Sequence, residues 1–175
     1  MAAEPLSWSR AELSALLLKA GRGAGMPLAH AEDMARAVGR HGHGDAMDAV
    51  LRGLETPWAA VRMEMESGCL TIRDARAVQA LPHVVEALRG GCTAAVLVDL
   101  DEPCLLPVYL HGTGLGALSE RGLWRVAHGA PSAAQTDVHP VTADQIARLE
   151  VYAARTYVPA SATSRDGAGQ GADQD

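Results

Sequence analysis

The sequence predicts an α+β fold, because helical patterns fill both ends of the chain and short strand-like runs lie between them. Two capping boxes, Ser9–Glu12 and Thr142–Gln145, each precede apolar residues at helical spacing. The run Thr93–Asp99 is short, apolar and bounded by glycine and charge, which is typical of a strand. We therefore expect an N-terminal helical cluster, a small and mostly antiparallel sheet in the middle, and a C-terminal helix followed by an extended Gly-rich segment.

The length of 175 residues favours one globular domain, which we expect over residues 1–158. Within it, the helical cluster would span 6–57, a mixed α/β part 58–138, and the terminal helix 142–157. Residues 159–175 contain no large apolar side chain to anchor them. Their composition leaves open whether this C-terminal segment is ordered or disordered.

Three helices are expected in the N-terminal cluster. The first follows Ser9 and should end in the glycine series that starts at Gly21, because glycine tolerates left-handed backbone. The second should begin near Ala29, and the third after Asp45, whose side chain can cap it. The residues expected on the three apolar faces are Leu13, Leu16, Leu17 and Ala20, then Met34, Ala37, Val38 and His41, then Met47, Val50, Leu51 and Leu54.

The middle of the chain is expected to combine short helices with strands. Asp74–Leu81 and Pro82–Arg89 look like two helices, the second opened by proline at its first position. Cys104–Leu110 and Leu123–Ala127 are candidate partner strands for Thr93–Asp99. Pro107 would place the first of these at a sheet edge, since proline cannot donate to a ladder.

Charge and composition argue against several classes of protein. The net charge is −6 and the arginines are scattered, so a nucleic-acid-binding face is not expected, although a local basic patch is possible. The apolar runs are too short to span a bilayer, and the N-terminus does not resemble a signal peptide, so we expect a cytoplasmic protein that does not bind membranes. The three cysteines lack C-x-x-C spacing and are expected to be reduced, mostly buried thiols, with no metal site and no cofactor.

The densest chemical cluster in the sequence is His41-Gly-His43-Gly-Asp45. Two imidazoles and a carboxylate could act as acid/base groups or as metal ligands. However, residues two apart point to different sides of a helix, and no further ligand motif accompanies them. The alternative is that His41 packs on the apolar face of its helix and His43 is a solvated turn residue.

Three other motifs could bind anions. Lys19 and Arg22 flank the end of the first helix, where cations are also favoured by the helix dipole alone. Gly112-Thr-Gly-Leu-Gly-Ala117 matches G-x-G-x-x-A, but a dinucleotide fingerprint needs a following helix, so a glycine-rich turn between strands is the preferred interpretation. The tail offers hydroxyls, a guanidinium and free amides that suit a phosphate or carboxylate. The tail residues concerned are Ser161, Ser164 and Arg165.

Both ends of the chain resemble an uncharacterised bacterial family, catalogued as domain of unknown function 3726. The start carries its Lys19-Ala…Arg22-Gly-Ala-Gly25 pattern and a second helix with Ala31-Glu-Asp33, and the end carries Thr156-Tyr-Val-Pro-Ala-Ser-Ala-Thr-Ser-Arg-Asp-Gly-Ala-Gly169. The resemblance implies a cytoplasmic bacterial protein and no particular reaction. It also suggests that the tail is an ordered segment lying beside the Lys19–Arg22 turn.

Two classes of function follow. The first is an accessory protein that binds a small anionic metabolite or a protein partner through Lys19, Arg22, Ser161, Ser164 and Arg165. The second is a small enzyme in which His41 or His43 acts as acid/base. The second class gains from a distant resemblance of the first fifty residues to the start of malate/L-lactate dehydrogenases, in which Ser-His-Gly follows the second helix. Here His41-Gly or His43-Gly is the equivalent, without the serine.

Overall fold

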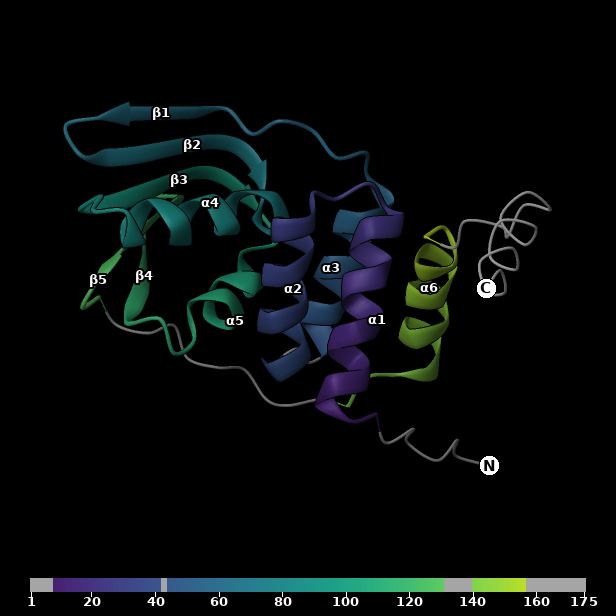
Figure 1. The fold of residues 1–175 in the computed structure, drawn as a ribbon. Coiled ribbons are helices and arrows are strands. Elements are labelled where there is room, and N and C mark those ends of the chain that lie inside the picture. The colour runs from purple at the N-terminus through teal and green to yellow at the C-terminus, as the bar shows by residue number, and fades with distance from the viewer. Residues whose placement is uncertain (1–7, 42–43, 131–139, 157–175) are drawn as a thin grey trace, which may run out of the picture.

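The protein has an α+β fold, as predicted, in which a helical cluster lies beside a five-stranded mixed sheet (Figure 1). The computed structural model describes residues 8–41, 44–130 and 140–156. The cluster consists of helices α1 (Arg10–Gly23), α2 (Leu28–His41) and α3 (Gly44–Glu55), together with α6 (Ala143–Ala154) from the other end of the chain. One continuous apolar core runs through both parts.

Helix α1 begins and packs as its sequence predicts, but it ends two residues later than the first glycine of its series. The Ser9 hydroxyl accepts from the Glu12 N–H at 3.2 Å, and the Glu12 carboxylate accepts from the Ser9 N–H at 2.9 Å. Of the three glycines, only Gly25 has a positive φ. Gly21 and Gly23 are helical and let neighbours approach: a Cβ at Gly23 would lie 1.8 Å from the carbonyl oxygen of Tyr152 on α6.

Helix α6 closes the cluster through a second capping box and a buried amide. The Thr142 hydroxyl accepts from the Gln145 N–H, and the Gln145 side chain accepts from the Thr142 N–H. The Nε2 atom of the buried Gln145 also donates to Asp48 Oδ1 on α3, at 2.7 Å. A buried side-chain amide needs such partners, so this bond fixes how the terminal helix sits on α3.

The sheet has the order β1-β2-β3-β5-β4 and is mostly antiparallel. Its one parallel pair is β2 (Cys69–Arg76) with β3 (Ala94–Asp101), joined by helix α4 (Ala77–Arg89), which covers one face of the sheet. The edges are β1 (Met63–Glu66) and β4 (Leu115–Glu120), and β5 (Leu123–His128) lies between β4 and β3. The predicted strands at 93–99 and 123–127 are therefore confirmed.

Two predictions for the middle of the chain are wrong. The helix predicted over 74–81 begins only at Ala77, because β2 runs to Arg76, which pairs with Asp101 of β3. Helix α4 then runs through Pro82 without a break, since the side chains from Ala77 to Pro82 are all buried and packing outweighs the one hydrogen bond that proline removes.

Residues 104–110 are also helical where a strand was predicted. They form the 3₁₀ turn η1 (Pro103–Leu105) and the short helix α5 (Leu106–Leu110). The chain turns out of β3 at Glu102, whose φ is 60°, and Pro107 then occupies the first turn of α5, where no N–H is needed. Within the described ranges, no helix is both long and apolar enough to cross a membrane.

Candidate functional site

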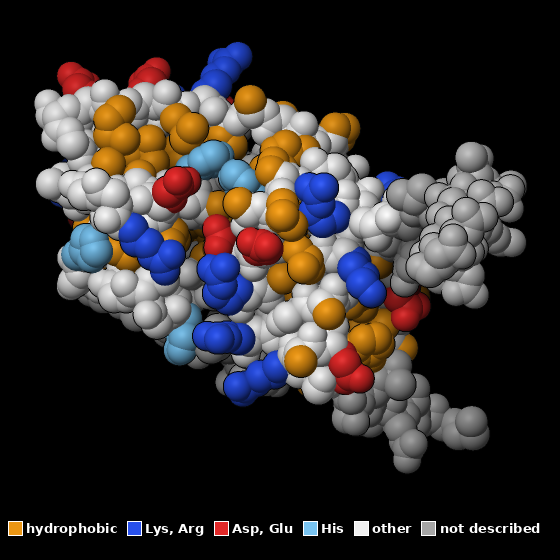
Figure 2. Space-filling view, in the orientation of Figure 1, with side chains coloured by type: hydrophobic (Ala, Val, Ile, Leu, Met, Phe, Trp, Pro, Cys, Tyr) orange, Lys and Arg blue, Asp and Glu red, His pale blue; other side chains and the backbone are white. Residues whose placement is uncertain are grey.

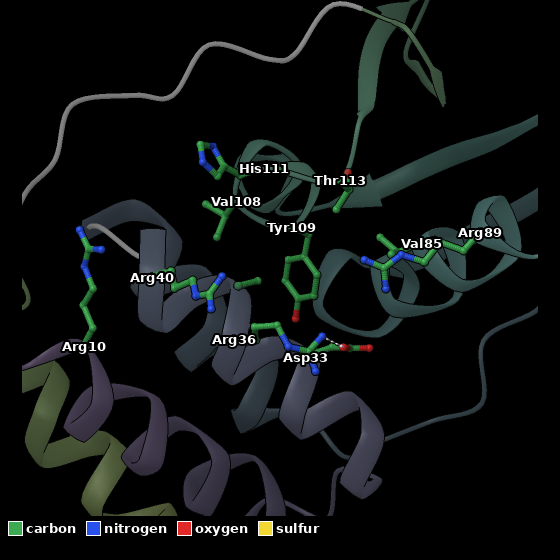
Figure 3. Close-up of a pocket in the computed structure, with 12 residues that line it drawn as sticks. Arg10, Asp33, Arg36, Arg40, Val85, Arg89, Val108, Tyr109, His111 and Thr113 are labelled. Atoms are coloured by element: carbon green, nitrogen blue, oxygen red, sulfur yellow. Dashed lines mark hydrogen bonds and ion pairs between the residues drawn. The ribbon is translucent and has the colours of Figure 1, made fainter.

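The described residues enclose a pocket of about 630 Å³ where α2, α4 and α5 meet, with the start of α1 at its rim (Figure 3). Arg36 and Arg40 lie four residues apart on α2 and therefore share one helix face. Arg89 is the last residue of α4, and Arg10 is the first of α1. Figure 3 shows Arg36, Arg40 and Arg89 directed toward Tyr109 in the middle, with Arg10 farther away.

The charge of this pocket is opposite to that of the whole chain. Four guanidinium groups line it against one carboxylate, that of Asp33, although the chain has a net charge of −6. Asp33 Oδ1 accepts from Arg36 at 2.7 Å. Among the described residues, Arg10, Arg40 and Arg89 have no carboxylate partner. Figure 2 shows basic side chains gathered on this face.

Apolar side chains and the ring of a tyrosine line the pocket between the arginines. Val85, Val108 and Tyr109 line it together with Ala37. The Tyr109 hydroxyl is buried and has no hydrogen-bond partner among the described residues, and it points toward Asp33 and Arg36. Burial, with a smaller contribution from the Asp33 charge, raises the pKa of Tyr109 far above its usual range. Tyr109 is therefore neutral at every physiological pH.

The glycine-rich turn after α5 supplies the remaining wall. The Thr113 hydroxyl donates to the Leu110 carbonyl at 2.6 Å, and Gly112 and Gly114 have φ values of 71° and 76°. Strand β4 begins at Leu115, so no helix follows the G-x-G-x-x-A motif, and the dinucleotide interpretation is wrong. The turn joins a helix to a strand, rather than two strands as predicted, and Gly112 and Thr113 line the pocket.

The residues predicted as ligand-binding from sequence do not form this pocket. Lys19 is exposed on α1, and Arg22 donates to the Met26 carbonyl at 3.0 Å, which closes the turn between α1 and α2. The predicted site residues Ser161, Ser164 and Arg165 lie outside the described residues, as does His43. The backbone of His41 ends α2, one residue after the pocket-lining Arg40, and its side chain lies outside the description.

The thiol of Cys104 is a poor candidate for a catalytic nucleophile. All three cysteines are free and half-buried, somewhat more accessible than predicted. Burial raises the pKa of the Cys104 thiol, although Arg52 lowers it, so the nucleophilic thiolate is scarce at neutral pH. The sulfur lies 3.8 Å from the Glu102 carbonyl, a weak contact that fits a packed thiol.

Sequence reasoning missed the pocket because its arginines come from three separate helices. The only local signal was the four-residue spacing of Arg36 and Arg40. Arg89 joins them only because β2 and β3 carry α4 back toward α2. No family model, no curated protein and no solved structure matches the chain.

Proposed function

We propose that this chain is a cytoplasmic accessory protein of bacterial metabolism that binds a small anionic metabolite in the pocket between α2, α4 and α5. One observation carries the proposal: three guanidinium groups from two helices are directed at one hollow, and Arg40 and Arg89 have no carboxylate partner among the described residues. The bacterial and cytoplasmic parts rest on the resemblance of the chain ends to an uncharacterised family.

The electrostatics of the pocket support an anionic ligand. Like charges that converge around a hollow repel one another, and a bound anion would offset that repulsion. Guanidinium groups also form paired hydrogen bonds with carboxylate and phosphate oxygens. The Asp33 carboxylate would keep Arg36 in place while the pocket is empty.

The size and the walls narrow the class of ligand. A volume of about 630 Å³ suits a metabolite rather than a single inorganic ion. Val85 and Val108 offer a small apolar surface beside the cations. We therefore favour a compact molecule with at least two anionic groups, either carboxylates or phosphates, on a short carbon skeleton.

The residues that the sequence predicted to bind an anion are expected to contribute less to binding than the arginines of the pocket. Arg22 is engaged with the Met26 carbonyl, so it has less freedom to bind a ligand than Arg40. The enzyme alternative, with His41 or His43 as acid/base, stays a prediction. The position of His41 next to Arg40 in sequence is what supports it.

Calorimetry and thermal unfolding with citrate and with pyrophosphate test the proposal, because a ligand that binds only the folded state raises the midpoint. We expect one of these polyanions to bind, and Arg40→Gln or Arg89→Gln to weaken its affinity by about tenfold or more, since a charged hydrogen bond contributes roughly 1.5–3 kcal/mol. Arg125→Gln is the matched control, because Arg125 is exposed on β5 away from the pocket. Equal losses in all three variants, or binding of neither polyanion, would contradict the proposal.

A further inference from the structure

Two histidines that are 53 residues apart in sequence meet at the contact between α2 and α4. The Nε2 atoms of His30 and His83 lie 3.2 Å apart, and the ring centroids are 4.7 Å apart. Trp58 also packs against His30 in an edge-to-face arrangement, with its ring centroid 5.2 Å away. Both imidazoles are half-buried, so solvent still reaches the pair.

Nε2 is the ring nitrogen of each histidine that faces the other ring. A metal ion binds the lone pair of a neutral imidazole nitrogen. The Nδ1 atom of His30 is buried and has no partner among the described residues. Its Nε2 atom, in contrast, lies beside Nε2 of His83.

The separation of the two Nε2 atoms matches that of two ligands on one ion. Zinc–nitrogen bonds of about 2.0–2.1 Å at a tetrahedral angle place two ligand nitrogens about 3.3 Å apart. The observed 3.2 Å is close to this value. Small rotations of the two rings would direct both lone pairs at one ion.

Carboxylates lie one helical turn beyond each histidine. Asp33 follows His30 on α2, and Glu86 follows His83 on α4, at the three-residue spacing that places side chains on one face. Asp33 is already paired with Arg36. Glu86 is exposed, and its charge reaches His30. In the described part of the chain, no three His, Cys, Asp or Glu side chains are already placed to hold a metal ion, so a third ligand requires a side-chain rotation.

We propose that His30 and His83 bind a divalent transition-metal ion of the zinc class through their Nε2 atoms, with Glu86 rotating in as a third ligand and water completing the shell. Imidazole is a preferred ligand of Zn²⁺, Cu²⁺ and Ni²⁺. The ion would join α2 to α4, and so would fasten the helical cluster to the helix that covers the sheet. The proposal does not rest on the anion pocket, although Asp33 lines that pocket and also acts on His30 through its charge.

The test uses Zn²⁺ alone, added to chelator-treated protein at pH 7.5. Calorimetry should give one site, and long-range ¹H–¹⁵N spectra should show the imidazoles of His30 and His83 shifting together. His83→Ala should weaken Zn²⁺ binding by about tenfold or more, and Glu86→Gln by less. Lowering the pH to 5.5 should also weaken binding, because protons compete for the ring nitrogens.

Two control variants separate this site from adventitious binding. His128→Ala removes another imidazole, which contacts the Leu88 carbonyl at 3.3 Å, and Glu64→Gln removes an exposed carboxylate on β1. Both should bind Zn²⁺ like the unmodified protein. If His128→Ala loses as much affinity as His83→Ala, or if Zn²⁺ leaves the two imidazole signals unmoved, the pair is only an N–H···N hydrogen bond and the proposal is wrong.

Discussion

Two regions of the molecule carry arginines beside glycines, and they use them differently. At the turn between α1 and α2, Arg22 donates to the Met26 carbonyl and Lys19 projects from the outside of the helix. In the pocket, Arg36, Arg40 and Arg89 come from two helices and are directed at one hollow. The first region therefore uses a cation to satisfy its own backbone, whereas the second leaves the guanidinium groups of Arg40 and Arg89 available to an outside partner.

The difference teaches that residue type and spacing do not define an anion site by themselves. A helix C-terminus favours a cation through its dipole and through its free carbonyls, whether or not a ligand exists. Guanidinium groups that converge on one hollow gain no such stabilisation from the helix, because their mutual repulsion raises the electrostatic energy of the folded state. Convergence of cations on a hollow is therefore the more specific sign of an anionic ligand.

The largest effect expected in this comparison falls on Gly23, the last residue of α1, rather than on the cations beside it. In Gly23→Ala the new Cβ would lie 1.8 Å from the Tyr152 carbonyl oxygen, so α1 and α6 must move apart. We expect a loss of about 2–3 kcal/mol in the free energy of unfolding, as for other overpacked contacts. Urea unfolding followed by circular dichroism measures it.

Gly90→Ala is the matched control for this substitution. Gly90 also ends a helix at negative φ, −77°, but its Cβ would meet nothing closer than 3.3 Å. We expect a change well under about 1 kcal/mol for Gly90→Ala. Similar losses in the two variants would mean that the close approach of α1 to α6 is not what Gly23 permits.

Gly23 also marks how far the sequence could predict the fold. Local signals placed every helix of the cluster, because a capping box or an apolar face is complete within a few residues. The role of Gly23 depends on α6, more than a hundred residues away, and the series was therefore interpreted only as a helix stop. Residues 104–110 were predicted to be a strand for a different reason: a short apolar run fits a buried strand and a buried helix equally well.

The candidate site was less predictable than the fold. Arg36 and Arg40 share a helix face that the sequence reveals, but Arg89 reaches them only through the β2–α4–β3 crossover. The contact of His30 with His83 likewise requires α2 to pack on α4. Neither set has a spacing that a single sequence can reveal, because the residues converge in space and not along the chain.

A substitution at Tyr109, which lines the pocket, should have an effect of intermediate size on the free energy of unfolding. Tyr109→Phe removes a hydroxyl that is buried without a partner among the described residues. An unsatisfied buried group is destabilising, so we expect the free energy of unfolding to rise by about 1 kcal/mol in the absence of any anion. Since the hydroxyl is covered, the affinity for citrate or pyrophosphate should stay within about twofold. A stability loss instead would show that the hydroxyl has a partner in solution, and a large affinity loss would make it a ligand-binding group.

The smallest effect on stability is expected for a substitution of Arg22, at the turn between α1 and α2. This variant also gives the most direct test of whether the turn or the pocket binds the anion. Arg22→Ala removes one hydrogen bond from an exposed side chain to the Met26 carbonyl, so the free energy of unfolding should fall by only about 0.5 kcal/mol. Calorimetry with the polyanion that binds the unmodified protein should give an unchanged affinity. A loss as large as that of Arg40→Gln would mean that the turn binds the anion, and the distinction drawn between the two regions would then fail.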